Sequence, residues 1–235
     1  MNIVITGSSR GIGFELAKQF ARNGNHNIFA ISRNPERLNE LKSACIRENV
    51  EAHLYPIPFD LTSNSHFEES LFKKIFELAP TIDILINNAG YLANSRFDEL
   101  SDEDLNQMTQ VNFTAPAKLI KTLLPIMKSG THVVNIGSMG GFQGSVKFSG
   151  LAGYSATKAA LASLTECLAE EYKESGISFN CLMLGAVNTE MLAQAFPEMS
   201  APLNADEMAS FIVDFALNGN RFFNGKIIPV STSTP

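Results

Sequence analysis

The sequence predicts an α/β fold: a doubly wound parallel sheet of about seven strands with helices on both faces. Two observations support this. Short apolar runs rich in β-branched residues alternate with longer segments of helical periodicity along the 235 residues, as in sheets built from crossover units. No linker, repeat or change of composition interrupts the alternation, so we expect a single domain over residues 1–235. A hydrophobic content of 45% is ample for its core.

Seven apolar runs predict the strands. They cover 3–6, 27–31, 53–59, 82–86, 132–136, 178–184 and 226–230. The third run contains Pro56 and Pro58, which lack the backbone N–H that a sheet interior requires. We therefore expect this strand to be irregular at its end or to lie at an edge of the sheet.

Helical periodicity predicts the connecting segments. The expected helices cover 11–23, 35–45, 67–78, 101–128, 151–174, 189–196 and 205–218. Pro35 suits the first turn of the second helix, where no N–H is needed. Ser101 precedes three acidic residues, which is a capping pattern, and we expect the long helix that follows to be disturbed near Pro116.

Composition and charge exclude several functions. The net charge is −6 with no basic block, which argues against nucleic acid and anionic membranes as partners. No apolar run approaches the roughly 18 residues of a spanning helix, and the start of the sequence lacks a signal-peptide pattern. Cys45, Cys167 and Cys181 are far apart and predict free thiols in a reducing, cytoplasmic setting. The four histidines lack metal-ligand spacing, so we expect no metal site.

A glycine-rich turn follows the first strand. Residues 6–13 read Thr-Gly-Ser-Ser-Arg-Gly-Ile-Gly. Gly7 permits a tight turn, Gly11 lets the backbone approach a pyrophosphate at the helix N-terminus, and Gly13 permits close packing of helix on sheet. An ordinary βα turn is the alternative, but the position and the spacing favour a dinucleotide. The predicted binding residues of this turn are Gly7, Ser9, Arg10, Gly11, Ile12 and Gly13.

The end of the second strand predicts the choice of cofactor. An acidic residue here binds the ribose hydroxyl of NAD, whereas arginine accommodates the 2′-phosphate of NADP. The chain has Ser32 and Arg33, with Arg10 nearby in the turn and no carboxylate over 31–35. Two solvated arginines are the alternative, but this composition favours NADP(H) over NAD(H).

Tyr154 and Lys158 are candidates for proton chemistry. Their spacing of four residues places them one turn apart on the same helix face. An ammonium group favours the phenolate and lowers a tyrosine pKa that is otherwise about 10. So short a pattern also arises by chance, and its meaning depends on the motifs around it.

Taken together, several separated motifs resemble the short-chain dehydrogenase/reductase family over nearly the whole chain. They are the glycine turn, Asp60, Asn-Asn-Ala-Gly at 87–90, Asn112, Ser138, and Tyr154 with Lys158. The resemblance implies a Rossmann-like fold, a homodimer or homotetramer, and hydride transfer between a nicotinamide and a carbonyl or alcohol carbon. Helices 102–128 and 152–175 are the expected dimer faces.

The resemblance also assigns cofactor contacts beyond the turn. Asp60 is expected to meet the adenine amino group, with a backbone group of Leu61 beside it; a turn aspartate is the alternative. Asn88, Ala89 and Gly90 are expected to border the cofactor ribose at the end of a central strand, although asparagine and glycine also favour turns.

The catalytic assignment comes from the same resemblance. Ser138 is expected to hold the substrate oxygen near Tyr154, which acts as general acid or base. Lys158 is expected to bind the nicotinamide ribose and, with oxidised nicotinamide, to lower the pKa of Tyr154. Asn112 is expected to disturb its helix and hold a water that relays protons to Lys158.

The chain departs from the family pattern after the sixth strand. Leu184 stands where the family usually has proline, so its backbone is less restricted. Gly185, Val187 and Thr189 are still expected to shape the carboxamide pocket, and the apolar segment 191–203 is expected to be a substrate lid. Ser-Thr-Ser at 231–233 replaces the usual Asp-Gly-Gly, which puts tetramer contacts of the tail in doubt.

Three functions follow from these residues. The favoured one is an NADP(H)-dependent carbonyl reductase acting on a small, fairly apolar ketone or aldehyde. A 3-oxoacyl-acyl-carrier-protein reductase is an alternative, although the acidic chain lacks an obvious basic docking patch. A non-catalytic NADPH-binding regulatory protein is the other, since some relatives of this fold have lost catalysis.

Overall fold

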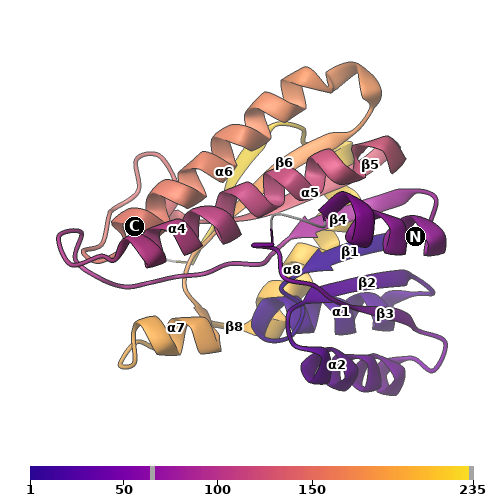
Figure 1. The fold of residues 1–235 in the computed structure, drawn as a ribbon, viewed down its shortest axis with the longest axis horizontal. Coiled ribbons are helices and arrows are strands. Elements are labelled where there is room, and N and C mark those ends of the chain that lie inside the picture. Colours follow the sequence, from indigo (N-terminus) through magenta and orange to yellow (C-terminus); the bar gives the residue numbers. More distant parts are fainter. Residues whose placement is uncertain (64–66, 233–235) are drawn as a thin grey trace.

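Seven parallel strands form the central sheet of the computed structural model, which describes residues 1–63 and 67–232 (Figure 1). The strands are β1 Asn2–Thr6, β2 Asn27–Ser32, β3 His53–Pro58, β4 Ile82–Asn87, β5 Met127–Ser138, β6 Ser178–Leu184 and β9 Lys226–Val230. Their order is β3-β2-β1-β4-β5-β6-β9. The predicted fold class is confirmed, and β3 lies at an edge as its prolines indicated. The extent of the domain stays a prediction.

The strand order reverses between β1 and β4. From β1 the chain adds β2 and β3 on one side, then returns to place β4 on the other side of β1, where Ile5 pairs with Ile86. The carboxyl ends of β1 and β4, at Thr6 and Asn87, therefore lie together. In open α/β sheets, ligands bind outside the strands at such a switch point.

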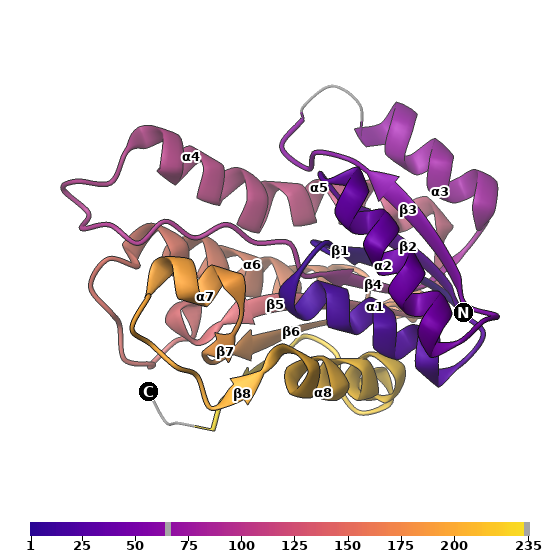
Figure 2. The same cartoon turned by 90° about the horizontal axis from the view of Figure 1, so that it is seen from below.

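Helices cover both faces of the sheet (Figures 1 and 2). Alternate residues of β1 serve opposite faces, because Ile3 and Ile5 join one core cluster and Val4 joins the other. The first cluster includes helices α1 Gly11–Asn23, α2 Pro35–Glu48 and α8 Ala205–Asn218. The second includes α3 Lys73–Leu78, α5 Ala115–Leu123 and α6 Ala152–Glu171.

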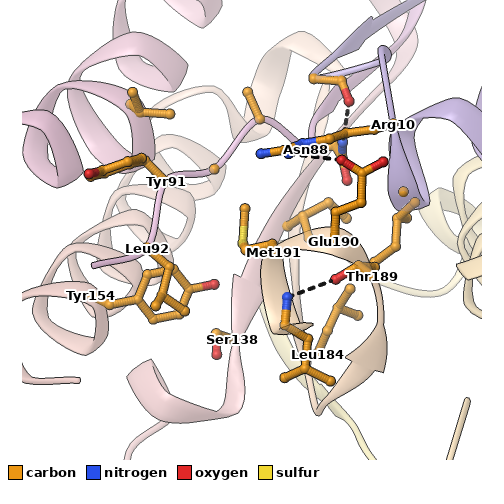
Figure 3. Close-up of a pocket in the computed structure, with 18 of the residues that line it drawn as sticks. Arg10, Asn88, Tyr91, Leu92, Ser138, Tyr154, Leu184, Thr189, Glu190 and Met191 are labelled. Carbon is orange, nitrogen blue, oxygen red and sulfur yellow. Dashed lines mark hydrogen bonds and ion pairs between the residues drawn. The ribbon is translucent and has the colours of Figure 1, made fainter. Parts of the chain in front are cut away.

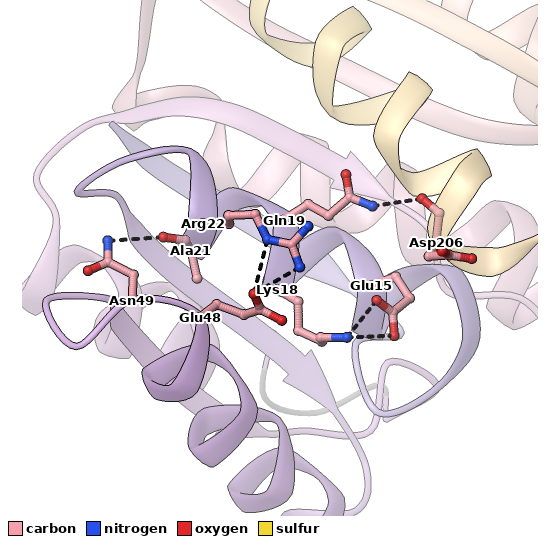
Figure 4. Close-up of polar contacts among 8 residues, drawn as sticks. All are labelled: Glu15, Lys18, Gln19, Ala21, Arg22, Glu48, Asn49 and Asp206. Atoms are coloured by element: carbon pink, nitrogen blue, oxygen red, sulfur yellow. Dashed lines mark hydrogen bonds and ion pairs between the residues drawn. The ribbon is translucent and has the colours of Figure 1, made fainter.

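Polar contacts hold α1 between its two neighbours (Figure 4). Arg22 forms an ion pair of 2.8 Å with Glu48 at the end of α2. Gln19 donates to the carbonyl oxygen of Asp206 in α8 at 2.7 Å. Such exposed contacts contribute little free energy individually, but they fix the orientation of the helix that carries the glycine turn.

The predicted helix over 101–128 is interrupted around Asn112, where a disturbance was expected, and not at Pro116. Helix α4 Asp102–Thr109 is followed by a π-helical turn, Gln110–Thr114, before α5 begins. Pro116, the other expected disturbance, lies in the first turn of α5, where a missing N–H is tolerated. A 3-10 turn, Leu124–Ile126, ends the helix, and β5 starts five residues before the predicted 132.

Two short strands that the sequence did not predict follow β6, on either side of the helix expected over 189–196. Strands β7 Val187–Asn188 and β8 Leu203–Asn204 pair in parallel, and helix α7 Glu190–Ala195 lies between them in the chain. In Figure 1, α7 stands apart from the helices that flank the sheet. This stretch of the chain contains the segment 191–203, whose role as a lid stays a prediction.

Within residues 1–63 and 67–232, no helix has both the length and the apolar character needed to cross a bilayer. Over the same residues, no group of three or more histidine, cysteine or acidic side chains is arranged to hold a metal ion.

Candidate active site

A cavity of about 740 Å³ opens at the carboxyl ends of the central strands (Figure 3). Its lining comes from the glycine turn, the end of β2, and the segments that follow β3, β4, β5 and β6. All predicted site residues line it except Gly13 and Asn112. Segments far apart in sequence therefore meet at the place that the strand order indicates.

The glycine turn leaves no space for side chains at two of its positions. Gly7 has a φ of 69°, and a Cβ there would lie 2.8 Å from the Cα of Ala89. A Cβ on Gly13 would collide with the carbonyl oxygen of Gly7. Gly13 thus acts through packing, which explains its absence from the lining. Arg10 gives no side-chain cap to α1, so the N–H groups of the first turn suit a pyrophosphate.

Asparagine amides tie the switch point together. Asn88 Nδ2 donates to the carbonyl oxygen of Thr6 at 3.0 Å, and the N–H groups of Asn88 and Ala89 both donate to Thr6 Oγ1 at 3.0 Å. Asn87 Nδ2 donates to Asn135 Oδ1 in β5 at 2.8 Å. The ends of β1, β4 and β5 are therefore held in a fixed relation around the cavity.

Arginines gather where the 2′-phosphate of NADP was expected. Arg10 and Arg33 line the cavity with Ser32, and Arg37 in α2 joins them. Arg37 was not predicted, because in the sequence it resembles any solvated helix arginine; its place one turn after the end of β2 was the available signal. Glu190 bridges Arg10 at 3.0 Å and Arg37 at 3.2 Å. Hydrogen bonds from Arg10 and then Arg37 lower the pKa of Glu190.

Asp60 lies in a local turn and also borders the cavity, so its two predicted roles are compatible. Its Oδ1 accepts from the N–H of Thr62 at 3.0 Å and from Thr62 Oγ1 at 2.8 Å, which is a local turn. Asp60 and Leu61 also border the cavity. The turn thus holds the carboxylate at the wall where adenine recognition was expected.

Tyr154 and Ser138 face the same part of the cavity (Figure 3). Ser138 ends β5, and Tyr154 lies in the first turn of α6. Burial raises the pKa of Tyr154 to about 12, and a hydrogen bond with Ser138 opposes this rise. The expected lowering of this pKa is therefore not found in the protein alone, because desolvation outweighs the interaction with Ser138.

The ammonium group of Lys158 contacts the backbone of β5. Its Nζ donates to the carbonyl oxygen of Ile136 at 2.7 Å and lies 5.8 Å from the ring centre of Tyr154. Burial lowers the pKa of Lys158 to about 8, and the nearby thiol of Cys181 opposes this effect. The predicted effect of Lys158 together with oxidised nicotinamide on Tyr154 stays a prediction.

Asn112 is buried within the π-helical turn, so the predicted local disturbance is found. Its Oδ1 accepts from the N–H of Tyr91 at 2.8 Å, and its Nδ2 donates to the carbonyl oxygen of Tyr91 at 2.9 Å and to Thr157 Oγ1 at 3.1 Å. A Cβ on Gly90 would lie 3.6 Å from Asn112 Oδ1 and 3.8 Å from Lys158 Nζ. Asn112 thus connects the end of β4 to α6, beside Lys158.

The other half of the cavity is apolar. Its apolar side chains come from the end of β6 and from the segments after β4, β5 and β6. They are Leu92, Val111, Met139, Phe148, Leu151, Leu184, Met191, Leu192, Phe196 and Met199. Four of these, Met191, Leu192, Phe196 and Met199, belong to the predicted lid segment 191–203. Such a wall suits an apolar substrate group.

Backbone contacts define the segment after β6 despite the missing proline. The N–H of Gly185 donates to the carbonyl oxygen of Val230 at 2.9 Å, which directs the chain after Leu184. A Cβ on Gly185 would lie 2.6 Å from Ser231 Oγ, so the altered tail packs against this turn. Thr189 Oγ1 accepts from the N–H of Leu192 at 3.3 Å and caps α7.

The short chain dehydrogenase family matches residues 1–200. A fatty acyl-CoA reductase of Acinetobacter baylyi is 31% identical over 218 residues, covering 91% of this chain and 72% of that protein. A short chain dehydrogenase of Shigella flexneri 2a, solved in complex with NADP, superposes with a TM-score of 0.86 at 27% identity, covering 97% of this chain and 95% of that one.

Levodione reductase has the same fold, with a TM-score of 0.87 at 24% identity over 98% of this chain and 95% of that one. The fold match agrees with the family match and with the seven-stranded sheet. The chain therefore belongs to the short-chain dehydrogenase/reductase family of oxidoreductases.

Proposed function

We propose that this protein is an NADP(H)-dependent oxidoreductase that interconverts an apolar ketone or aldehyde with its alcohol. One observation carries the proposal. A single cavity joins the glycine turn, the hydroxyl groups of Tyr154 and Ser138, and an apolar wall. Cofactor, proton donor and substrate can therefore meet within about one hydrogen-bond length of a reacting oxygen, as general acid catalysis requires.

The residues present fit a dinucleotide. Gly7 and Gly13 allow close approach of backbone segments, and the uncapped first turn of α1 suits the pyrophosphate. The preference for NADP(H) rests on Arg10, Arg33 and Arg37 at the adenosine end. Guanidinium groups bind phosphate through paired hydrogen bonds. The NADP complex of the Shigella flexneri relative supports this preference.

Tyr154 and Ser138 have different roles at the substrate oxygen. Nicotinamide cofactors supply the hydride in reductions of this kind. Ser138 donates a hydrogen bond to the carbonyl oxygen, and Tyr154 transfers its phenolic proton to the same oxygen as charge develops there. A pKa of about 12 keeps Tyr154 protonated at neutral pH, which favours its role as an acid in reduction. In oxidation Tyr154 accepts the proton of the alcohol.

Lys158 and Asn112 support this pair. Lys158 holds the ribose hydroxyls of the cofactor through its ammonium group. Asn112 positions Tyr91 and α6, and its Oδ1 keeps acceptor capacity for a water beside Lys158. Such a water would return protons from solvent to the site.

The apolar wall sets the class of substrate. Ten apolar side chains surround the space beside Tyr154, which favours a hydrocarbon group next to the carbonyl. The name of the Acinetobacter baylyi relative, a fatty acyl-CoA reductase, points to a substrate with an alkyl chain.

The assembly we propose is a homodimer or homotetramer in the cytoplasm. It uses the face of α6 where Ala152, Ala156, Ala159 and Ser163 are exposed, and the mass in solution tests this.

Steady-state kinetics test the proposed reaction. Purified protein is assayed with NADPH and NADH against aldehydes and 2-ketones of increasing chain length, and against a 3-oxoacyl thioester of acyl carrier protein. We expect NADPH to be preferred and kcat/KM to increase with chain length. Tight NADPH binding without turnover of any compound would instead support the regulatory alternative. A strong preference for the carrier-protein thioester would support the other alternative.

A further inference from the structure

Glu190 lies directly before the segment 191–203 that is expected to be the lid. It is the first residue of α7, yet its side chain reaches back to the phosphate-binding turn and to α2. Figure 3 shows the Glu190 carboxylate against the guanidinium of Arg10. Oε2 contacts Arg10 Nη1 at 3.0 Å, and Oε1 contacts Arg37 Nη1 at 3.2 Å. One carboxylate thus bridges two segments of the cofactor site.

These two ion pairs tether one end of the lid. The other end is held separately, because Asn94 Nδ2 donates to the carbonyl oxygen of Ala195 at 2.8 Å. Helix α7 therefore spans the cavity between the adenosine side and the segment after β4. All three charged side chains of the tether are about half exposed, at 42%, 45% and 49%. Exposed ion pairs are weak enough to exchange partners.

A phosphate at the adenosine end would need the same cations. Arg10 and Arg37 line the cavity next to Ser32 and Arg33, where the 2′-phosphate is expected. A phosphate dianion beside the Glu190 carboxylate would create repulsion between like charges. A guanidinium that turns its paired donors to phosphate withdraws them from the carboxylate.

We propose that Glu190 and the 2′-phosphate of NADP(H) compete for Arg10 and Arg37. NADP(H) binding then releases the N-terminal end of α7 from the phosphate-binding turn, whereas NAD(H) leaves it tethered. The inference rests on the proposed preference for NADP(H) and adds a regulatory step to that site. Because linkage between two binding equilibria is reciprocal, the contacts of Glu190 with Arg10 and Arg37 weaken the binding of a 2′-phosphate by the same factor by which the phosphate weakens those contacts.

Binding of two nucleotide fragments tests the competition. Adenosine 2′,5′-bisphosphate carries the 2′-phosphate, and adenosine 5′-phosphate lacks it. Glu190→Gln should tighten the bisphosphate by about threefold to tenfold, the range for one or two exposed ion pairs, and change the monophosphate less than about twofold. Glu198→Gln is the matched control, since it removes the same charge from the exposed segment after α7 and should alter neither affinity.

Hydrogen exchange of α7 tests the release. In the wild-type protein, the amides of 190–195 should exchange faster with NADPH bound than with NADH bound. In Glu190→Gln the two complexes should exchange alike. Slower exchange with NADPH than with NADH in the wild type would show that Glu190 stays engaged, and would overturn the inference.

The fragments also separate this inference from the proposed function. A wild-type protein that binds both fragments equally would refute the NADP(H) preference and the competition together. A wild-type preference for the bisphosphate that Glu190→Gln leaves unchanged, or reduces, would refute the competition alone.

Discussion

Replacing Tyr154 with phenylalanine removes the proton donor and little else. Ser138 is the hydroxyl partner that influences its pKa, and the ring keeps its apolar contacts. A positioned general acid contributes about 10² to 10⁴ in rate, so kcat of the reduction should fall by that factor. This corresponds to about 3–5 kcal/mol of transition-state stabilisation.

The assay separates chemistry from binding. Single-turnover oxidation of NADPH at saturating ketone reports the chemical step, and fluorescence titration reports NADPH affinity. We expect the Kd of NADPH to change less than about threefold, because the phenylalanine ring occupies the same place in the cavity wall as the tyrosine ring. Ser138→Ala is the companion variant, and the double variant should lose less than the product of the two single losses, since both act on one oxygen. A Tyr154→Phe protein with near wild-type single-turnover rates would refute the assignment of Tyr154 as the acid.

Two further predictions concern the scaffold. Gly13→Ala should weaken NADPH binding by tenfold or more and destabilise the fold by about 1–3 kcal/mol, because its Cβ meets the Gly7 carbonyl; wild-type affinity with an unchanged denaturation midpoint would contradict this. Burial lowers the pKa of His132 below 6.5. Below about pH 6.5 the imidazole is therefore protonated in the unfolded chain but not in the folded one, and the free energy of unfolding decreases as the pH falls. Urea titrations between about pH 7 and pH 5 should show a smaller loss for His132→Gln than for wild type, with the exposed His53→Gln as control; equal slopes in all three would contradict it.

Local patterns were sufficient to predict the sheet. Apolar runs gave β6 and β9 their observed bounds, and Pro56 indicated the edge position of β3. The glycine spacing located the phosphate-binding turn, because positions where backbone segments approach closely require glycine. The residues that form the pattern are the same residues that need the space.

Features that depend on contacts between distant segments were missed. The ion pairs of Glu190 join residues separated by 153 and 180 positions, and nothing local marks them. The pairing of β7 with β8 consists of two residues on each side, too few to form a periodic pattern. The burial that raises the pKa of Tyr154 in the protein alone could not be predicted either, because the sequence shows only the ammonium four residues away. The effect of Lys158 together with oxidised nicotinamide stays a prediction.

The π-helical turn also limits where the chain can gain or lose residues. A π-helical turn holds about one residue more than an α-helical turn, so deleting one residue from Gln110–Thr114 would restore regular helix and remove the bulge that presents Asn112. Met108 packs against Gly153, where a Cβ would lie 2.7 Å from the methyl carbon Cε of Met108. That contact seats the residue directly before Tyr154. A one-residue deletion in this turn would therefore disturb Asn112 and the packing of α4 against the start of the catalytic helix, and homologues that vary in length should do so in the surrounding loops and not in this turn.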